Sequence, residues 1–84
     1  MQSLKVYSRD GCHLCELLME ELLPLVRGRL DVEICDIDSR PDWREKYDIR
    51  IPVVEFDNRP ICQYSLDRPA ISRLLESLSA ESGE

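Results

Sequence analysis

The sequence has little that would hold the chain in a membrane or on a nucleic acid. Among its 84 residues, no apolar run approaches the roughly 20 residues that span a bilayer. Its 17 acidic residues outnumber its 11 basic residues, which gives a net charge of −6. Such a chain lacks the positive surface that binds nucleic acid or an anionic membrane. We therefore expect no nucleic acid and no membrane among its partners.

The N-terminus also lacks the features of an export signal. Residues 1–5 contain no charged stretch followed by a long apolar one. The sequence therefore predicts a cytoplasmic protein, in a compartment where thiols are kept reduced. It has no internal repeat and no low-complexity linker, and its length suits a single domain. We place this domain at 1–79, with a polar C-terminal tail at 80–84.

Four cysteines stand out against this background. They are Cys12, Cys15, Cys35 and Cys62. Two structural disulfides would be expected in a small exported protein, whereas a chain without an export signal favours a redox pair or a metal site. Only Cys12 and Cys15 are close in sequence, so their spacing is the feature to interpret.

Hydrophobic periodicity predicts strands that alternate with helices. The expected strands are residues 4–7, 32–37, 53–56 and 61–65. A first helix is expected from about 13 to 27. A second helix should begin near Ser39, which has capping-box spacing to Asp42, and end near Asp48. A last helix, capped by Asp67, carries an apolar stripe formed by Ile71, Leu74, Leu75 and Leu78.

The connections between these elements predict a mixed sheet. The first strand, helix and second strand form a unit that favours parallel strands with a right-handed crossover. Residues 57–60 read as a tight turn in which Asn58 tolerates a positive φ, so the third and fourth strands should form an antiparallel hairpin. The expected class is α/β, in the order β-α-β-α-β-β-α, with four strands and three helices.

The spacing of Cys12 and Cys15 predicts disulfide chemistry. The thiolate is the nucleophile in disulfide exchange, and a helix N-terminus stabilises it through partial positive charge and unpaired N–H groups. Positions three apart on a helix are neighbours, so Cys15 can reach Cys12 and release it from a mixed disulfide. We expect Cys12 to attack first and Cys15 to resolve. His13, the only histidine, either tunes the thiol or is a solvent-exposed residue at the helix start.

Two other interpretations of the pair stay open. A Cys-x-x-Cys pair is also half of a zinc site, so two chains could share a metal or a cluster through Cys12 and Cys15. The chain could also be a redox-inert binding module whose partner docks on Trp43 and Tyr47, although packing of these aromatics under the sheet is the favoured alternative. The position of the pair between a strand and a helix favours the redox interpretation.

The order of these motifs resembles the glutaredoxin and thioredoxin superfamily over residues 3–79. Tyr7-Ser8-Arg9-Asp10-Gly11-Cys12-His13-Leu14-Cys15 and Arg50-Ile51-Pro52-Val53-Val54 resemble a small bacterial glutaredoxin-like family more narrowly. The resemblance implies a thioredoxin (glutaredoxin-like) fold with sheet order 2-1-3-4.

In that sheet order Cys35 and Cys62 lie on opposite outer strands, about 14 Å apart. Cys62 is expected at the end of the sheet away from Cys12. The separation is too large for a disulfide, so we expect Cys35 and Cys62 to be small, partly buried apolar residues. They should not join Cys12 in a metal cage.

The resemblance also implies a substrate-binding surface. Pro52 would be cis and would pack beside Cys12, and the Ile51 backbone would offer hydrogen bonds to a bound peptide or to glutathione. Arg9 matches a basic residue that contacts the glutathione carboxylate in many glutaredoxins. The alternative for Arg9 is a solvated loop charge.

The sequence departs from common glutaredoxins before the last helix. A Gly-Gly pair whose N–H groups bind the γ-glutamyl carboxylate of glutathione is absent, because residues 62–67 contain no glycine. We therefore predict a monomeric thiol–disulfide oxidoreductase that acts on a disulfide-containing protein or a small thiol. It needs no bound cofactor, since the dithiol carries the electrons, and glutathione stays open only as a co-substrate.

Overall fold

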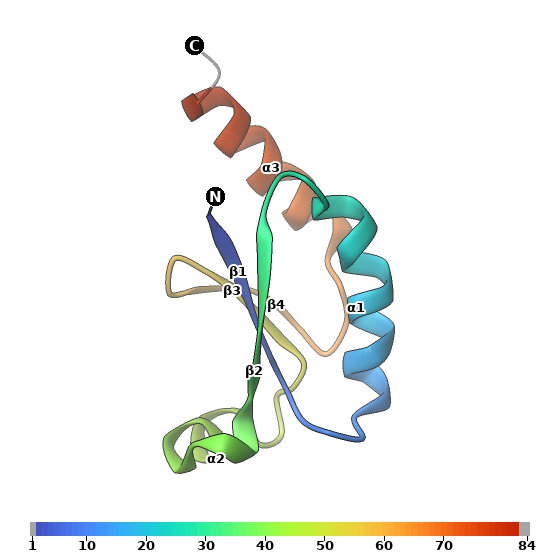
Figure 1. Ribbon diagram of the computed structural model, residues 1–84, viewed down its shortest axis with the longest axis vertical. Helices are drawn as coiled ribbons and strands as arrows, with labels where there is room; N and C mark the ends of the chain where they lie inside the picture. The colour runs from blue at the N-terminus through green and yellow to red at the C-terminus, as the bar shows by residue number, and fades with distance from the viewer. Residues whose placement is uncertain (1, 83–84) are drawn as a thin grey trace.

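The computed structural model describes residues 2–82 and has helices on both faces of a four-stranded sheet (Figure 1). Its elements in chain order are β1 (Ser3–Ser8), α1 (His13–Val26), β2 (Asp31–Asp36), the short 3-10 helix η1 (Ile37–Ser39), α2 (Pro41–Tyr47), β3 (Val53–Phe56), β4 (Arg59–Gln63) and α3 (Arg68–Ser82). None of the helices in this part of the chain combines the length and the apolarity needed to cross a membrane.

The sheet has the order β2-β1-β3-β4, which confirms the mixed thioredoxin-like topology. β1 pairs with β2 in parallel, with Val6 opposite Ile34. β1 pairs antiparallel with β3, where Val6 lies opposite Val54, and β3 pairs antiparallel with β4. The C-terminal end of β1 and the N-terminal end of β3 therefore lie at the same end of the sheet. At this end the chain continues from β1 into the Cys12 loop.

Each face of the sheet has its own core because strand side chains alternate between the faces. α1 and α3 cover one face, where Leu22 and Ile71 are fully buried against Val6 and Val54. α2 covers the other face, where Tyr47 packs with Tyr7 and with neighbours from β2, η1 and β3. Full burial of one aliphatic side chain contributes about 1.5–3 kcal/mol, so these two layers hold the fold together.

The aromatic side chains of α2 pack onto the sheet. Tyr47 is buried and stacks on Tyr7 with ring centroids 4.2 Å apart. Trp43 meets the edge of the Tyr7 ring at a centroid distance of 5.4 Å. The interpretation of Trp43 and Tyr47 as an open partner-binding face was therefore wrong, because the tyrosine is buried in the core.

The beginning of the second helix differs from the prediction. Ser39 does not form a capping box, because it lies in η1 and its hydroxyl donates to the backbone oxygen of Asp36 at 2.7 Å. Arg40 is the N-cap residue of α2 and makes no capping hydrogen bond with its side chain. Pro41 occupies the first helical turn, where its fixed φ suits a helix and its missing N–H costs nothing.

The hairpin turn is shorter than predicted. Asp57 and Asn58 have φ values of 55° and 65°, so these two residues alone form the turn. β4 therefore covers residues 59–63 rather than the expected 61–65. Pro60, expected in the turn, fits in β4 because that strand lies at the edge of the sheet.

The last helix begins as predicted and extends further than predicted. The side chain of Asp67 accepts a hydrogen bond from the N–H of Ala70 at 3.1 Å, which confirms the cap. α3 continues to Ser82, so the helix includes the first part of the expected polar tail, 80–84. Residues 83–84 lie outside the described part of the chain.

Candidate active site

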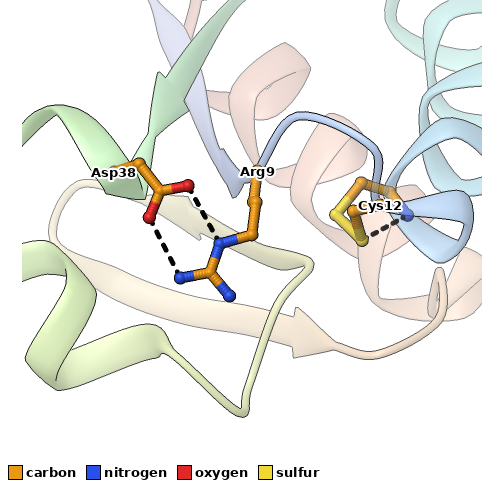
Figure 2. The surroundings of a disulfide bond; sticks show 4 residues. Arg9, Cys12 and Asp38 are labelled. Atoms are coloured by element: carbon orange, nitrogen blue, oxygen red, sulfur yellow. Dashed lines mark hydrogen bonds and ion pairs between the residues drawn. A yellow bond between two sulfur atoms is a disulfide. The ribbon is translucent and has the colours of Figure 1, made fainter.

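Cys12 and Cys15 lie at the junction between the β1 loop and α1 and are joined by a disulfide (Figure 2). Their Cα atoms are 5.2 Å apart, within the ordinary range for a disulfide. Gly11 has a φ of 80°, a left-handed conformation that glycine adopts without strain. This residue turns the loop so that Cys12 becomes the N-cap of α1.

The sulfur of Cys12 caps the helix. The N–H of Cys15 donates to Cys12 Sγ at 3.2 Å, in the position that a serine or aspartate oxygen occupies at other helix N-termini. A hydrogen bond of this kind strengthens when the acceptor becomes an anion, and the helix dipole acts in the same direction. In the reduced protein we expect this geometry to favour the thiolate of Cys12.

The two cysteines differ in exposure. Cys12 is partly exposed, whereas Cys15 has only 4% of its surface exposed. A disulfide partner in solution therefore has access to Cys12 and not to Cys15. Cys15 nevertheless lies in contact with Cys12, which is the arrangement needed for an internal second attack.

We expect Cys12 to be the fastest-reacting thiol of the fully reduced chain. Burial raises the pKa of Cys35 and of Cys62, whereas a helix N-terminus lowers that of a thiol from about 8.5 to between about 3.5 and 7.5. A limiting amount of iodoacetamide at pH 7 should modify Cys12 about tenfold or more faster than Cys62. Peptide mass spectrometry measures this order, and equal labelling of Cys12 and Cys62 would show that the helix end does not activate the thiol.

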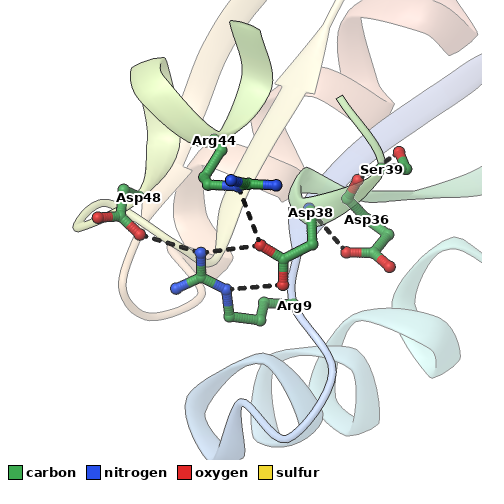
Figure 3. A network of polar contacts seen from close by, with 6 residues as sticks. All are labelled: Arg9, Asp36, Asp38, Ser39, Arg44 and Asp48. Atoms are coloured by element: carbon green, nitrogen blue, oxygen red, sulfur yellow. Dashed lines mark hydrogen bonds and ion pairs between the residues drawn. The ribbon is translucent and has the colours of Figure 1, made fainter. Parts of the chain in front are cut away.

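Arg9 is held by two carboxylates (Figure 3). Its Nε and Nη2 atoms donate to both oxygens of Asp38 at 3.0 Å, and Nη2 also lies 3.0 Å from Asp48 Oδ1. Arg44 approaches the same Asp38 carboxylate at 3.5 Å. The Arg9 bonds lower the pKa of Asp38, and the two aspartates raise the pKa of Arg9. Arg9 is thus paired with two surface carboxylates, and its predicted contact with a glutathione carboxylate stays a prediction.

Loss of the Arg9 guanidinium should cause a pH-dependent loss of stability. The pKa of Asp38 in the folded chain is below its ordinary 3.8, so its contribution is present above that value and disappears as the pH falls through the lowered pKa. We expect Arg9→Gln to have a lower Tm than the parent at pH 7 and the same Tm once the pH is below the lowered pKa. The matched control is Arg59→Gln, since the exposed Arg59 has no ion pair within residues 2–82. A difference in Tm that persists unchanged in acid would contradict this account.

His13 is the first residue of α1 and is exposed. Its side chain makes no hydrogen bond and no ion pair within the described residues. Its role in tuning the thiol stays a prediction.

The Ile51-Pro52 peptide bond is cis, as predicted. Pro52 is buried, and its carbonyl oxygen accepts a hydrogen bond from the N–H of Tyr64 at 2.8 Å. The Ile51 backbone makes no hydrogen bond within residues 2–82, which is compatible with the predicted peptide-binding role. The contact predicted between Pro52 and Cys12 stays a prediction.

Cys35 and Cys62 lie on the outer strands β2 and β4, as expected, and both are free thiols. Cys35 is buried in the core under α2, and Cys62 packs beside the core under α1 and α3. The placement of Cys62 at the end of the sheet away from Cys12 was wrong, because it pairs with Val54 near the C-terminal end of β4. Within residues 2–82 no group of three or more histidine, cysteine or acidic side chains is arranged to hold a metal ion.

Sequence reasoning missed a pocket beside the disulfide. It has a volume of about 530 Å³ and lies between the Cys12 loop, the first turns of α1 and the end of β2. Met19 and Ile34 contribute apolar side chains to it. The exposed Ile34 belongs to a strand predicted from its apolar alternation, but its place beside Cys12 depends on how α1 crosses the sheet.

Solved structures share this fold. A structural genomics target protein from X. campestris, XcR50, has a TM-score of 0.69 and 28% identity, and the match covers 88% of this chain and 96% of that one. Thioredoxin 1 from Thermosipho africanus matches with a TM-score of 0.63 and 15% identity over 94% of this chain and 97% of that one. A mutant thioredoxin from Halobacterium salinarum matches with a TM-score of 0.58 and 23% identity over 89% and 72% of the two chains.

Comparison with protein families agrees with the fold and with the position of the cysteine pair. No curated protein sequence matches the chain significantly. The family model described as a glutaredoxin-like domain (DUF836) matches residues 3–76, which include Cys12, Cys15 and the cis Pro52. The chain therefore belongs to the glutaredoxin-like domain (DUF836) family.

Proposed function

We propose that the chain is a thiol–disulfide oxidoreductase in which Cys12 is the nucleophile and Cys15 the resolving thiol. The observation that carries the proposal is the capping of α1 by the Cys12 sulfur, with the Cys15 N–H 3.2 Å away. The difference in exposure between Cys12 and Cys15 supports the division of roles. The proposed setting is the cytoplasm, with the chain acting as a monomer.

The first step of the proposed reaction is an attack by the Cys12 thiolate on one sulfur of a substrate disulfide. The substrate S–S bond breaks, and the departing thiolate takes a proton from water. Cys12 is then joined to the other substrate sulfur in a mixed disulfide. The N–H of Cys15, which had stabilised the thiolate, stays directed at the same sulfur.

In the second step, Cys15 loses its proton to solvent and attacks Cys12 Sγ. The mixed disulfide breaks, the second substrate thiolate leaves, and the Cys12–Cys15 disulfide forms. Two electrons have passed from the dithiol to the substrate, so no bound cofactor is required. The same steps in reverse oxidise a substrate dithiol, and the reduction potential decides the direction.

The surroundings of the pair favour a disulfide substrate other than glutathione. Arg9, which in many glutaredoxins would contact a glutathione carboxylate, is already engaged by Asp38 and Asp48. The segment before α3 has no glycine pair to bind the γ-glutamyl carboxylate. Protein disulfides and small neutral disulfides are therefore the proposed substrates. Ile51 and Pro52 are proposed as the backbone surface on which an extended substrate rests.

The direct test is catalysed reduction of a disulfide-bonded test protein by dithiothreitol. The purified, metal-analysed chain should accelerate the reaction in proportion to its concentration. The Cys62→Ser variant is the matched control and should be as active as the parent, because Cys62 lies outside the motif. A folded chain that gives no acceleration, or that carries a tightly bound metal on Cys12 and Cys15, alone or shared between two chains, would refute the proposal.

A further inference from the structure

The α1–β2 groove comprises two hollows between these elements, the first of them beside the disulfide. The pocket of about 530 Å³ beside Cys12 forms its first part. A second hollow of about 290 Å³ lies between the C-terminal half of α1 and the start of β2. The connection between α1 and β2 is short, so the two elements lie side by side and antiparallel (Figure 1). Both hollows therefore lie between the same helix and the same strand.

The groove has apolar side chains along both of its sides. Met19 and Leu23 lie four residues apart and so share one face of α1. Val32 and Ile34 lie two residues apart on β2 and so point to the same face of the sheet. Leu23 is 40% exposed and Ile34 is 60% exposed. These side chains form an open apolar strip that leads away from Cys12.

The rim near the disulfide is acidic. The first pocket is lined by three acidic residues, Asp10, Glu16 and Asp36. One carboxylate oxygen of Asp36 accepts a hydrogen bond from the N–H of Asp38. The only basic residue there is Arg9, whose charge is balanced by two aspartates. Farther from Cys12, the second hollow is lined by one basic residue, Arg27, and one acidic residue, Asp31. Negative charge is therefore concentrated within reach of the reacting sulfur.

The outer edge of β2 adds backbone groups to this surface. β2 is an edge strand and pairs only with β1 within residues 2–82. Its free N–H and C=O groups could pair with an extended segment of another protein. The charged side chains of β2 are Asp31, Glu33 and Asp36, with no basic residue among them. A segment that pairs here would lie beside these three acidic residues, of which Asp36 shares the groove's face of the sheet with Val32 and Ile34.

We propose that this groove selects the partner of the oxidoreductase. The partner is a protein whose reactive cysteine lies in an extended segment with basic and aliphatic residues beside it. The aliphatic side chains fill the strip between Met19 and Ile34, and the basic ones meet Asp10, Glu16 and Asp36. Glutathione, with two carboxylates and one ammonium group, has the wrong charge for this rim. This inference rests on the proposed function and names its substrate class.

The test uses synthetic peptides of equal length, each carrying one cysteine in a mixed disulfide with 2-mercaptoethanol. One peptide has lysine and leucine beside the cysteine, a second has glutamate and leucine, and a third has lysine and serine. Stopped-flow measurement with the reduced chain gives a rate constant for each peptide. We expect the lysine–leucine peptide to react about tenfold or more faster than the glutamate–leucine peptide at low salt. The difference should shrink as salt is added, because exposed charges are screened.

Two variants locate the selection. Glu16→Gln should reduce the preference for lysine over glutamate, and Ile34→Ser should reduce the preference for leucine over serine. Both side chains are exposed, so the fold should tolerate the changes. The matched controls are Glu45→Gln on α2 and Leu17→Ser on α1, which lie outside the groove and should leave both preferences unchanged.

The outcomes separate this inference from the proposed function. The neutral disulfide of 2-mercaptoethanol, bis(2-hydroxyethyl) disulfide, reports on the chemistry alone. If the chain reacts with it but with all three peptides at equal rates, the groove does not select the partner and the inference is wrong. The same conclusion follows if the preferences survive Glu16→Gln and Ile34→Ser unchanged. If the neutral disulfide and all peptides fail to react, the oxidoreductase proposal itself fails.

Discussion

Replacement of Cys15 by serine is expected to stop turnover and to leave Cys12 in a stable mixed disulfide with the substrate. Cys15 is buried directly behind Cys12, and no other cysteine lies on α1 or its loop to release the bound substrate. Replacement of Cys12 by serine is expected to reduce turnover to the uncatalysed rate, because the remaining Cys15 is only 4% exposed. Intact-protein mass spectrometry after incubation with a peptide disulfide distinguishes the two variants.

The matched control for these variants is Cys35→Ser combined with Cys62→Ser, which removes both free thiols outside the motif. Any adduct in this background must lie on Cys12 or Cys15. An adduct on Cys15 of the Cys12→Ser variant would reverse the assigned roles. Full turnover by Cys15→Ser would show that an external thiol resolves the intermediate and that Cys15 is not required.

Removal of the Tyr47 hydroxyl is expected to give a second large effect, on stability. This hydroxyl donates to Glu55 Oε2 at 2.7 Å, and the two residues are only 4% and 7% exposed. Burial is the larger cause that raises the pKa of Tyr47, and the hydrogen bond to Glu55 is the second. The hydroxyl therefore remains a donor throughout the physiological range. Tyr47→Phe leaves a buried carboxyl group without its partner, which costs about 1–3 kcal/mol. Urea unfolding followed by circular dichroism measures this loss.

The control for Tyr47→Phe is Tyr64→Phe, since Tyr64 is 46% exposed and its hydroxyl makes no hydrogen bond within residues 2–82. That change should alter stability by no more than about 0.5 kcal/mol. In a Glu55→Leu background no buried carboxyl group remains, so Tyr47→Phe should cost less there. An equal cost in both backgrounds would mean that the hydrogen bond does not account for the loss.

The order of strands and helices could be predicted because the hydrophobic periodicity of most segments matches the strand or helix that they form. On α1 the buried Leu18 and Leu22 have helical spacing, and on β1 the buried Leu4 and Val6 alternate with Lys5. Both patterns reflect residues that face the core under α1 and α3. The position of Cys12 between β1 and α1 was enough to predict its place at a helix N-terminus. The boundaries that were wrong, at Ser39 and Pro60, depend on a 3-10 turn and on the edge position of β4. Neither of these is encoded in the residues nearby.

The contacts of the site could be predicted less well than its cysteines. Cys12 and Cys15 are three residues apart, so their pairing is a local event. The Asp38 partner of Arg9 lies 29 residues away, and only the return of the chain through β2 brings it near. The pocket beside Cys12 has the same origin, because Ile34 reaches it through the parallel pairing of β1 and β2. Long-range placement of this kind requires the assembled sheet.

The central claim, that Cys12 and Cys15 form a reversible redox dithiol, is tested most directly by equilibration in glutathione redox buffers. The chain is trapped with a thiol reagent at each ratio of reduced to oxidised glutathione, and the four cysteines are assigned by peptide mass spectrometry. We predict one two-electron transition confined to Cys12 and Cys15, with Cys35 and Cys62 reduced throughout. A pair that stays reduced at every ratio, or that is protected by a bound metal, would contradict the account.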